Sequence, residues 1–208
     1  MNSERDAFQR AVNVSRETLE RLDIYESLVQ KWTRRINLIA PGTLNALWSR
    51  HFLDSAQLLE LAPESAETWC DLGSGGGFPG AVIAILSAER APARSTTLIE
   101  SDQRKATFLR TVSRETGVRF QVLAERIEAA EPQQADIVSA RALAPLPELL
   151  PLVVRHVSAS GRALLLKGAG HAVELSNALE RWRFDCETHP SKTDSEAVVL
   201  NIGEIERV

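Results

Sequence analysis

The chain has 208 residues, of which 24 are Lys or Arg and 28 are Asp or Glu, giving a formal net charge of −4. Hydrophobic residues make up 44% and charged residues 25%, which is typical of a globular protein and excludes extended disorder. No apolar run approaches the roughly 20 residues of a membrane-spanning helix. The N-terminal sequence MNSERDAFQR lacks the apolar core of a secretory signal, and the two cysteines form no C-x-x-C pair. We therefore expect a cytoplasmic protein without a metal site.

Residues 1–62 carry apolar side chains at helical spacing, and no strand-like alternation occurs before residue 66. Ser15 is expected to cap a helix that Pro41-Gly42 ends, and Thr43 is expected to begin the next helix. We predict that residues 1–62 form a helical extension to a second domain.

Positive charge gathers within residues 31–56, where four cationic side chains face one acid, a local charge of +3 with His neutral. Composition alone favours a solvated helix face. A basic helical patch on an acidic protein also suits docking of a nucleic-acid backbone, so the extension is a candidate for facing RNA. The cations are Lys31, Arg34, Arg35 and Arg50, and the acid is Asp54.

The segment Arg50-His51-Phe52-Leu53-Asp54-Ser55 is richer in polar groups than a solvated face requires. Arg50 and Asp54 are four residues apart, the spacing of a helix-surface ion pair. The alternative interpretation is a polar cluster that faces a cleft.

From residue 66 onward, segments with strand character alternate with helical segments. This alternation predicts a mostly parallel sheet with helices on both faces, and we assign residues 63–208 to one α/β domain. No helix separates the last two strands, so they are expected to pair as an antiparallel hairpin. The expected strands are residues 68–72, 95–100, 118–123, 135–140, 161–168, 183–188 and 197–202, and the expected helices are residues 78–86, 103–116, 145–156 and 172–182.

The clearest motif is Asp71-Leu72-Gly73-Ser74-Gly75-Gly76-Gly77-Phe78-Pro79-Gly80, which follows an expected strand and opens an expected helix. Ligands of open α/β sheets bind at the carboxyl ends of the strands. Glycines there let the backbone approach a ligand and adopt positive φ, and this loop holds more of them than a tight turn needs. Glu100 ends the next expected strand, 20 residues after Gly80.

Two ligand classes fit this glycine loop. Residues 75–80 match G-x-G-x-x-G, the dinucleotide fingerprint, which predicts an NAD(P)-dependent oxidoreductase. S-adenosylmethionine (SAM) fits better, because Asp71 precedes the glycines and the chain ends in a hairpin instead of a second mononucleotide-binding half. Asp71 can hold the SAM ammonium, the backbone at Gly73 and Gly75 can pass the methionine tail, and Glu100 can accept both ribose hydroxyls.

Over nearly its whole length the sequence resembles the RsmG (GidB) family of bacterial rRNA methyltransferases. The glycine loop and residues 50–55 carry the resemblance most specifically, with support from residues 37–39, 100–109, 139–142 and 167–168. The family uses SAM to methylate N7 of one guanine in the 530 loop of 16S rRNA. The resemblance implies a Rossmann-like SAM-dependent methyltransferase fold. It also implies 16S rRNA as partner, within the small ribosomal subunit or an assembly intermediate, with no membrane and no obligate protein partner.

Carried over residue by residue, the resemblance places Gly73 and Phe78 along the cofactor, and Ala124 and Glu125 beside its adenine. Arg141 would face the methyl-transfer site as the catalytic group, or would hold the SAM carboxylate. Guanine N7 has a free lone pair, so no general base is expected. The polar residues assigned to the RNA are Arg34, Arg35, Asn37, Arg50, His51, Asp54, Lys105 and Lys167.

Residues 89–94 depart from the family as an insertion, which we expect only to lengthen a surface loop. Because a fold does not determine an activity, a non-catalytic SAM-binding protein stays a further interpretation beside the methyltransferase and the oxidoreductase.

Overall fold

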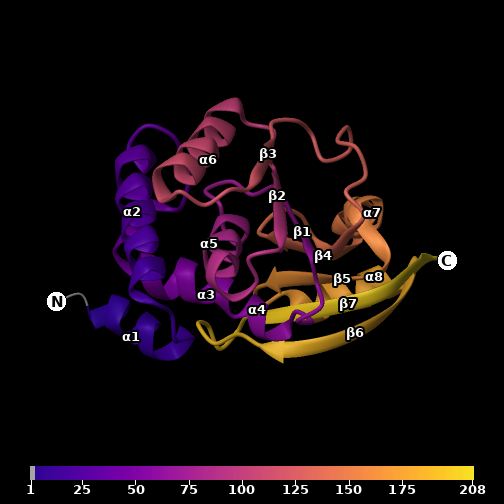
Figure 1. Ribbon diagram of the computed structural model, residues 1–208. Coiled ribbons are helices and arrows are strands. Elements are labelled where there is room, and N and C mark those ends of the chain that lie inside the picture. Colours follow the sequence, from indigo (N-terminus) through magenta and orange to yellow (C-terminus); the bar gives the residue numbers. More distant parts are fainter. Residues whose placement is uncertain (1–2) are drawn as a thin grey trace.

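The computed structural model describes residues 3–208, which form a seven-stranded sheet between two layers of helices (Figure 1). In sheet order the strands are β3 (Gln121–Leu123), β2 (Ser95–Ile99), β1 (Thr68–Leu72), β4 (Ala135–Arg141), β5 (Val157–Lys167), β7 (Val198–Arg207) and β6 (Trp182–Pro190). β7 pairs antiparallel with β5 and β6, and the other pairs are parallel. The expected mostly parallel sheet with a C-terminal antiparallel hairpin is confirmed.

Helices cover both faces of this sheet. One face buries Cys70, Leu72 and Ile99 against α7 (Leu146–His156) and α8 (His171–Leu179). The other face buries Leu98 against α5 (Gly80–Arg90) and α6 (Gln103–Thr116). The alternation of inward side chains along each strand places these two sets on opposite faces. Within residues 3–208, no helix is both long and apolar enough to cross a membrane.

The N-terminal helices α1 (Ser3–Val12) and α2 (Arg16–Thr33) pack against α5 and α6 in one hydrophobic cluster (Figure 1). Ser15 caps α2 as expected, and its hydroxyl accepts a hydrogen bond from the Thr18 N–H at 3.2 Å. The cluster crosses the predicted boundary between residues 62 and 63. The division into units 1–62 and 63–208 stays a prediction, and residues 1 and 2 of the extension lie outside the described range.

The single helix expected from Thr43 onward is wrong. The chain forms a 3-10 turn η1 (Pro41–Ala46), a π-helical turn η2 (Trp48–Leu53) and two short helices, α3 (Asp54–Ala56) and α4 (Leu58–Leu61). The Ser55 hydroxyl donates to the His51 carbonyl at 2.6 Å, and such side-chain bonds compete with the regular helical pattern. Helical turns of the π type often mark functional sites, and this one carries His51 and Arg50.

Residues 89–94 do more than lengthen a surface loop, which corrects the sequence-based expectation. The first of them, Glu89, lies in the last turn of α5. It accepts hydrogen bonds from the Ser15 N–H and hydroxyl and from the Thr18 hydroxyl, the last at 2.6 Å. Arg90 donates to the Val12 carbonyl. Both contacts fasten the α1–α2 junction to the sheet-bearing part of the chain.

Tyr25 fastens α2 to the glycine loop. Its side chain is fully buried, its hydroxyl donates to the Gly76 carbonyl, and its ring stacks on Phe78 with centroids 5.4 Å apart. Gly77 has φ of +89°, and a Cβ there would collide with the Tyr25 hydroxyl. Glycine is therefore required at this position both for backbone conformation and for space.

Tyr25→Phe is expected to lower the free energy of unfolding by about 1–3 kcal/mol, because the buried Gly76 carbonyl loses its partner. Urea unfolding would measure the change. Ile24→Ala on the same helix is the control, because Ile24 is 40% exposed and its change should stay within about 0.5 kcal/mol. Equal stability of Tyr25→Phe and the wild type would show that this bond does not hold the loop.

Candidate cofactor and substrate sites

The carboxyl ends of β1, β2 and β4 meet at one edge of the sheet, and two cavities open there. The first, which we call the glycine-loop cavity, has a volume of about 380 Å³. The glycine loop follows β1, Glu100 follows β2, and residues 142–144 follow β4. Parallel strands bring these loops together because their carboxyl ends lie side by side. Its lining includes Gly73, Gly75, Ile99, Glu100, Lys105, Ile127, Leu143 and Leu152.

Glu100 is the fixed acid of the glycine-loop cavity. Its side chain is buried, one oxygen accepts from the Gly75 N–H at 2.8 Å, and the other accepts from the Asp102 N–H at 2.8 Å. Each carboxylate oxygen has a further lone pair available for a ligand. Gly73 and Gly75 have φ of +64° and +57°, so the loop adopts the left-handed conformation that glycine tolerates.

Asp71 has a structural position instead of a place on either cavity. It is fully buried, accepts from the Ser139 hydroxyl at 2.7 Å and from the Gly80 N–H at 3.1 Å, and so joins β1, β4 and the start of α5. Burial raises the pKa of its carboxyl to about 6, against the lowering effect of its hydrogen bonds. Any contact between Asp71 and a SAM ammonium stays a prediction.

Phe78, Ala124 and Glu125 also lie outside the lining of the glycine-loop cavity. Phe78 is buried against Tyr25, and the Ala124 carbonyl accepts from the Gln103 side chain at 2.9 Å. Residues 126–128, just beyond Glu125, line the cavity in their place. Any contact of Phe78, Ala124 or Glu125 with a cofactor stays a prediction.

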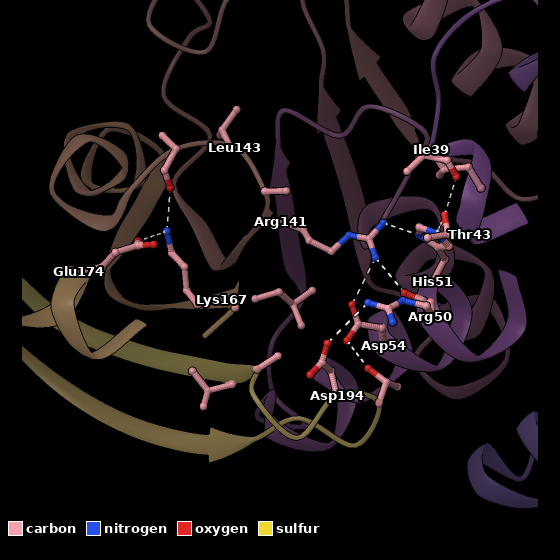
Figure 2. A pocket seen from close by; sticks show the side chains of 18 of the residues that line it. Ile39, Thr43, Arg50, His51, Asp54, Arg141, Leu143, Lys167, Glu174 and Asp194 are labelled. Atoms are coloured by element: carbon pink, nitrogen blue, oxygen red, sulfur yellow. Dashed lines mark hydrogen bonds and ion pairs between the residues drawn. The ribbon is translucent and has the colours of Figure 1, made fainter. Parts of the chain in front are cut away.

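The second cavity, whose lining Figure 2 shows, has a volume of about 700 Å³, and we call it the arginine cavity. Residues 142–144 line both cavities. Its polar lining comes from four separate parts of the chain and includes Thr43, Arg50, His51, Asp54, Arg141, Lys167, Glu174 and Asp194. Cationic donors and carboxylate acceptors therefore face the same space.

Arg141 is held at the end of β4 by three partners from η2 and α3 (Figure 2). It donates to the Arg50 carbonyl at 3.2 Å, to the Asp54 carboxylate at 3.2 Å and to His51 Nδ1 at 2.8 Å. Its guanidinium also lies over the Phe78 ring, 5.2 Å from the centroid. Hydrogen bonds to the extension therefore hold the guanidinium directly.

His51 acts as a neutral acceptor for Arg141. Burial and the nearby cations Arg141 and Arg50 lower the pKa of His51 to about 3. Because Arg141 can only donate, His51 Nδ1 accepts and its Nε2–H donates to the Thr43 hydroxyl at 2.9 Å. Thr43 in turn donates to the Ala40 carbonyl at 2.8 Å, so the network assigns one tautomer.

Some of the other residues assigned to RNA lie on the exposed surface, and others line a cavity. Arg34, Arg35 and Asn37 are exposed, and Lys105 lines the glycine-loop cavity. Arg50 is exposed and lies 3.5 Å from Asp194. The helix-surface pair expected between Arg50 and Asp54 is therefore wrong, since Asp54 pairs with Arg141 instead.

Lys167, like His51, is a buried member of the predicted RNA residues. Its ammonium donates to the Ala144 carbonyl at 2.7 Å and to the Glu174 carboxylate at 2.7 Å, on the opposite side of the arginine cavity from His51 (Figure 2). Only 8% of its side chain is exposed, and these two partners use two of its three N–H donors, so one donor remains for a ligand in the cavity.

Sequence reasoning missed the acids Glu174 and Asp194 and the hydroxyl of Thr193, which donates to Asp54 at 2.8 Å. Asp194 and Thr193 lie in the turn between β6 and β7, more than a hundred residues from Asp54 in sequence. No local pattern links these segments, because only the pairing of β7 with β5 brings the turn to the cavity.

The sheet order, the glycine loop after β1 and the acid after β2 together define the fold of the SAM-dependent methyltransferases. Solved structures agree with this class. A TehB-like SAM-dependent methyltransferase from Corynebacterium glutamicum superposes with a TM-score of 0.58 at 16% identity, covering 86% of this chain and 97% of that one. TYW2 from M. jannaschii, solved in complex with AdoMet, has a TM-score of 0.58 at 13% identity, covering 85% and 80%. These likenesses show the fold alone.

Relatives at higher identity define the family. The family model of GidB, described as rRNA small subunit methyltransferase G, matches residues 18–198. The ribosomal RNA small subunit methyltransferase G of Cereibacter sphaeroides is 48% identical over 197 residues, covering 95% of this chain and 96% of that protein. The protein of the same name from Parvibaculum lavamentivorans is 52% identical over 199 residues, covering 95% and 88%. The chain belongs to the GidB family, as the sequence motifs predicted.

His51 makes the stability of the protein depend on pH. An unfolded chain protonates this side chain near its ordinary pKa of 6.5, whereas the folded protein does so only near 3. Stabilisation is therefore complete above pH 6.5 and is lost as the pH falls, by about 1.4 kcal/mol per pH unit. Because of His51, the free energy of unfolding of the wild type should fall by roughly 2 kcal/mol between pH 6.5 and about 5. His51→Gln should lack this fall, as measured by urea unfolding at both pH values.

Thr43→Ser is the control for this measurement, because serine keeps the hydroxyl that accepts from His51 Nε2–H. The buried His156 also has a lowered pKa, but it is present in every variant and cancels in the comparison. An unchanged pH dependence in His51→Gln would contradict a neutral, buried His51.

Proposed function

We propose that the protein transfers the methyl group of SAM to N7 of a guanine in the 530 loop of 16S rRNA. The observation that carries the proposal is the pair of adjoining cavities that share residues 142–144. One suits a nucleoside cofactor and the other suits a polar nucleobase, so donor and acceptor would meet at the loop between them. Membership of the GidB family supports rRNA as the substrate.

The residues of the glycine-loop cavity fit SAM. Glu100 offers lone pairs for two ribose hydroxyls, Ile99, Ile127 and Leu152 offer apolar surface for adenine, and the glycine backbone leaves space for the methionine tail. When bound, SAM supplies an electrophilic methyl group on a sulfonium.

A dinucleotide fits this site less well. The pyrophosphate of such a cofactor would need free N–H groups at the start of α5. The Gly80 N–H is already bonded to the buried carboxylate of Asp71 at 3.1 Å. That N–H is therefore not free for the phosphates that the oxidoreductase interpretation requires there.

The arginine cavity offers partners that guanine requires. Guanine presents O6 and N7 as acceptors and its N1–H and exocyclic amine as donors. Arg141 and Lys167 can donate to O6 or to a phosphate, and the carboxylates of Glu174 and Asp194 can accept from N1–H and the amine. N7 attacks with its own lone pair, so catalysis rests on alignment, which can supply roughly 7–11 kcal/mol. Arg141 is then the catalytic positioning contact on the substrate side.

Several remaining predictions concern how the RNA docks. We propose that Arg34, Arg35, Asn37 and Arg50 contact the RNA backbone from the extension, with Lys105 beside the cofactor. His51 and Asp54 would act through Arg141, since both are bonded to it. We further propose that the substrate is 16S rRNA in the small ribosomal subunit or an assembly intermediate, in the cytoplasm.

The proposal is tested by transfer of labelled methyl from SAM to small subunits that lack the modification, with the methylated base mapped. Arg141→Lys should lower the rate by roughly a hundredfold, because an ammonium cannot replace the guanidinium that bonds three partners at once. SAM affinity should not change, since Arg141 lines the arginine cavity and not the glycine-loop cavity. Arg50→Lys is the matched control, exposed on the same cavity, and should cost only a few-fold.

Failure of the wild type to methylate any guanine N7 would reject the proposed reaction. A fall in SAM affinity that parallels the fall in rate for Arg141→Lys would move Arg141 to the cofactor instead.

Glu100→Gln tests the cofactor assignment separately. The side-chain amide of this variant would replace one carboxylate oxygen with an NH2 group. That NH2 group would face a backbone N–H and a ribose hydroxyl that both need an acceptor, so SAM affinity should fall at least about tenfold in calorimetry. Glu128→Gln is the control, because Glu128 lines the same cavity but is exposed and paired with Arg126. Unchanged SAM binding by Glu100→Gln would place the ribose elsewhere.

A further inference from the structure

A third cavity lies outside both sites, between the last turns of α2 and the first turn of α6. Its volume is about 520 Å³, within the roughly 300–1,000 Å³ of typical ligand sites. Trp32 and Ile36 supply its apolar surface, and Gln103 and Thr107 supply polar atoms from α6. We call it the Trp32 cavity.

Trp32 differs from two other tryptophans of the chain in its unused indole N–H. The Trp48 indole donates to Glu26 at 3.0 Å, and the Trp69 indole donates to Ser139 at 2.8 Å. The indole N–H of Trp32 has no hydrogen-bond partner within residues 3–208. Its ring is anchored edge-on to Phe108 with centroids 5.6 Å apart, so the indole is held in place while part of it lines the cavity.

Cationic side chains surround this apolar surface. Lys31, Arg35 and Arg104 line the Trp32 cavity, and Lys31, Arg34 and Arg35 line an adjacent hollow of about 370 Å³. Arg104 is paired with Asp102 at 3.1 Å, whereas Lys31, Arg34 and Arg35 form no ion pair with a described acid. In a chain with a net charge of −4, such a cluster is complementary to a polyanion.

We infer that the Trp32 cavity binds an unpaired nucleobase of the substrate RNA, stacked on the indole, with flanking phosphates on Lys31, Arg34 and Arg35. The inference rests on the proposed rRNA methyltransferase function. An aromatic platform beside a cationic groove is the combination that binds single-stranded nucleic acid, because every base has a face to stack and every nucleotide a phosphate.

The position of the cavity suits a second anchoring point for one RNA. Helix α6 carries Lys105 on the glycine-loop cavity and Arg104 on the Trp32 cavity, so consecutive residues serve both places. The free Oε1 of Gln103 can accept from the edge of the base, since Gln103 uses its amide nitrogen on Ala124. The Trp32 N–H points outward in the plane of its ring, so it can donate to a ribose or phosphate oxygen beside the stacked base. A base held here would fix the RNA relative to the cofactor without touching the reacting atoms.

Four proteins test the inference: the wild type, Trp32→Ala, Trp32→Phe and the control Ile24→Ala, which removes an exposed apolar side chain from the same helix. The probe is a 16S rRNA fragment that contains the 530 loop, and its dissociation constant is measured over a range of salt concentrations. Trp32→Ala should raise the dissociation constant roughly tenfold without changing the salt dependence. Trp32→Phe should recover most of the affinity, and Ile24→Ala should bind as the wild type does.

The double variant Arg34→Ala with Arg35→Ala should instead change the salt dependence of binding. Its salt slope should decrease by roughly 0.7 for each lost phosphate contact on a single strand. In ¹⁵N spectra the Trp32 indole signal, assigned by its absence in Trp32→Phe, should shift when the fragment is added. For Trp32→Ala, kcat for methyl transfer at saturating substrate should equal that of the wild type, and only KM should rise.

Wild-type affinity in Trp32→Ala, or an equal loss in Trp32→Phe, overturns the stacking inference while leaving the methyltransferase proposal intact. Lack of any binding of the fragment by the wild type also overturns it. A KM defect on small subunits with normal affinity for the RNA fragment overturns it in favour of a ribosomal-protein contact. If the wild type itself transfers no methyl group to rRNA, the proposed function fails instead. The dissociation constants of the variants then still decide whether the Trp32 cavity binds RNA.

Discussion

Phe78 connects the glycine loop to both the N-terminal helices and the substrate side of the sheet. Its ring stacks on Tyr25 of α2 and lies under the guanidinium of Arg141 at the end of β4. The Tyr25 hydroxyl holds the Gly76 carbonyl at the same time. Because the side chain is buried, the loop that would bind a cofactor cannot move independently of α2 or of Arg141. The extension is therefore part of the support of the site and not an appendage.

The neutral state of His51 has a role in this arrangement. A protonated imidazole could not accept from Arg141, and the two cations would repel each other. Burial keeps the pKa of His51 low, so the imidazole remains an acceptor at neutral pH. Together with Asp54 it holds the guanidinium at the wall of the arginine cavity (Figure 2). Orientation by buried groups suits a reaction at a nitrogen with a free lone pair, which needs alignment and no proton transfer.

Periodicity and turn chemistry were sufficient to predict the sheet, the helix over residues 103–116 and the antiparallel hairpin, because each depends on local pattern. The lining of the two cavities was predictable where a residue lies at the carboxyl end of a strand, as for Glu100 and Arg141, whose roles there stay predictions. It was not predictable where the partner comes from a distant segment, as for Tyr25 on Gly76 or Thr193 on Asp54. The helix expected after Thr43 failed for a related reason, since its turns adapt to contacts with β4 and the β6–β7 turn that no local window contains.

The same distinction explains why the basic patch of residues 31–56 gave an ambiguous signal. Its cations do not act as one surface: Arg50 belongs to the arginine cavity, whereas Lys31, Arg34 and Arg35 lie around a separate hollow at the end of α2. In the sequence these cations form one run of charge. In the fold, Arg50 lies at the proposed methyl-acceptor site, and the other three lie on a separate surface. Two separated cationic sites on a rigid body constrain the orientation of a long polyanion more than a single patch of equal charge. For an enzyme that must select one guanine within a folded RNA, orientation of the strand is the more demanding requirement, and net charge need not be positive to meet it.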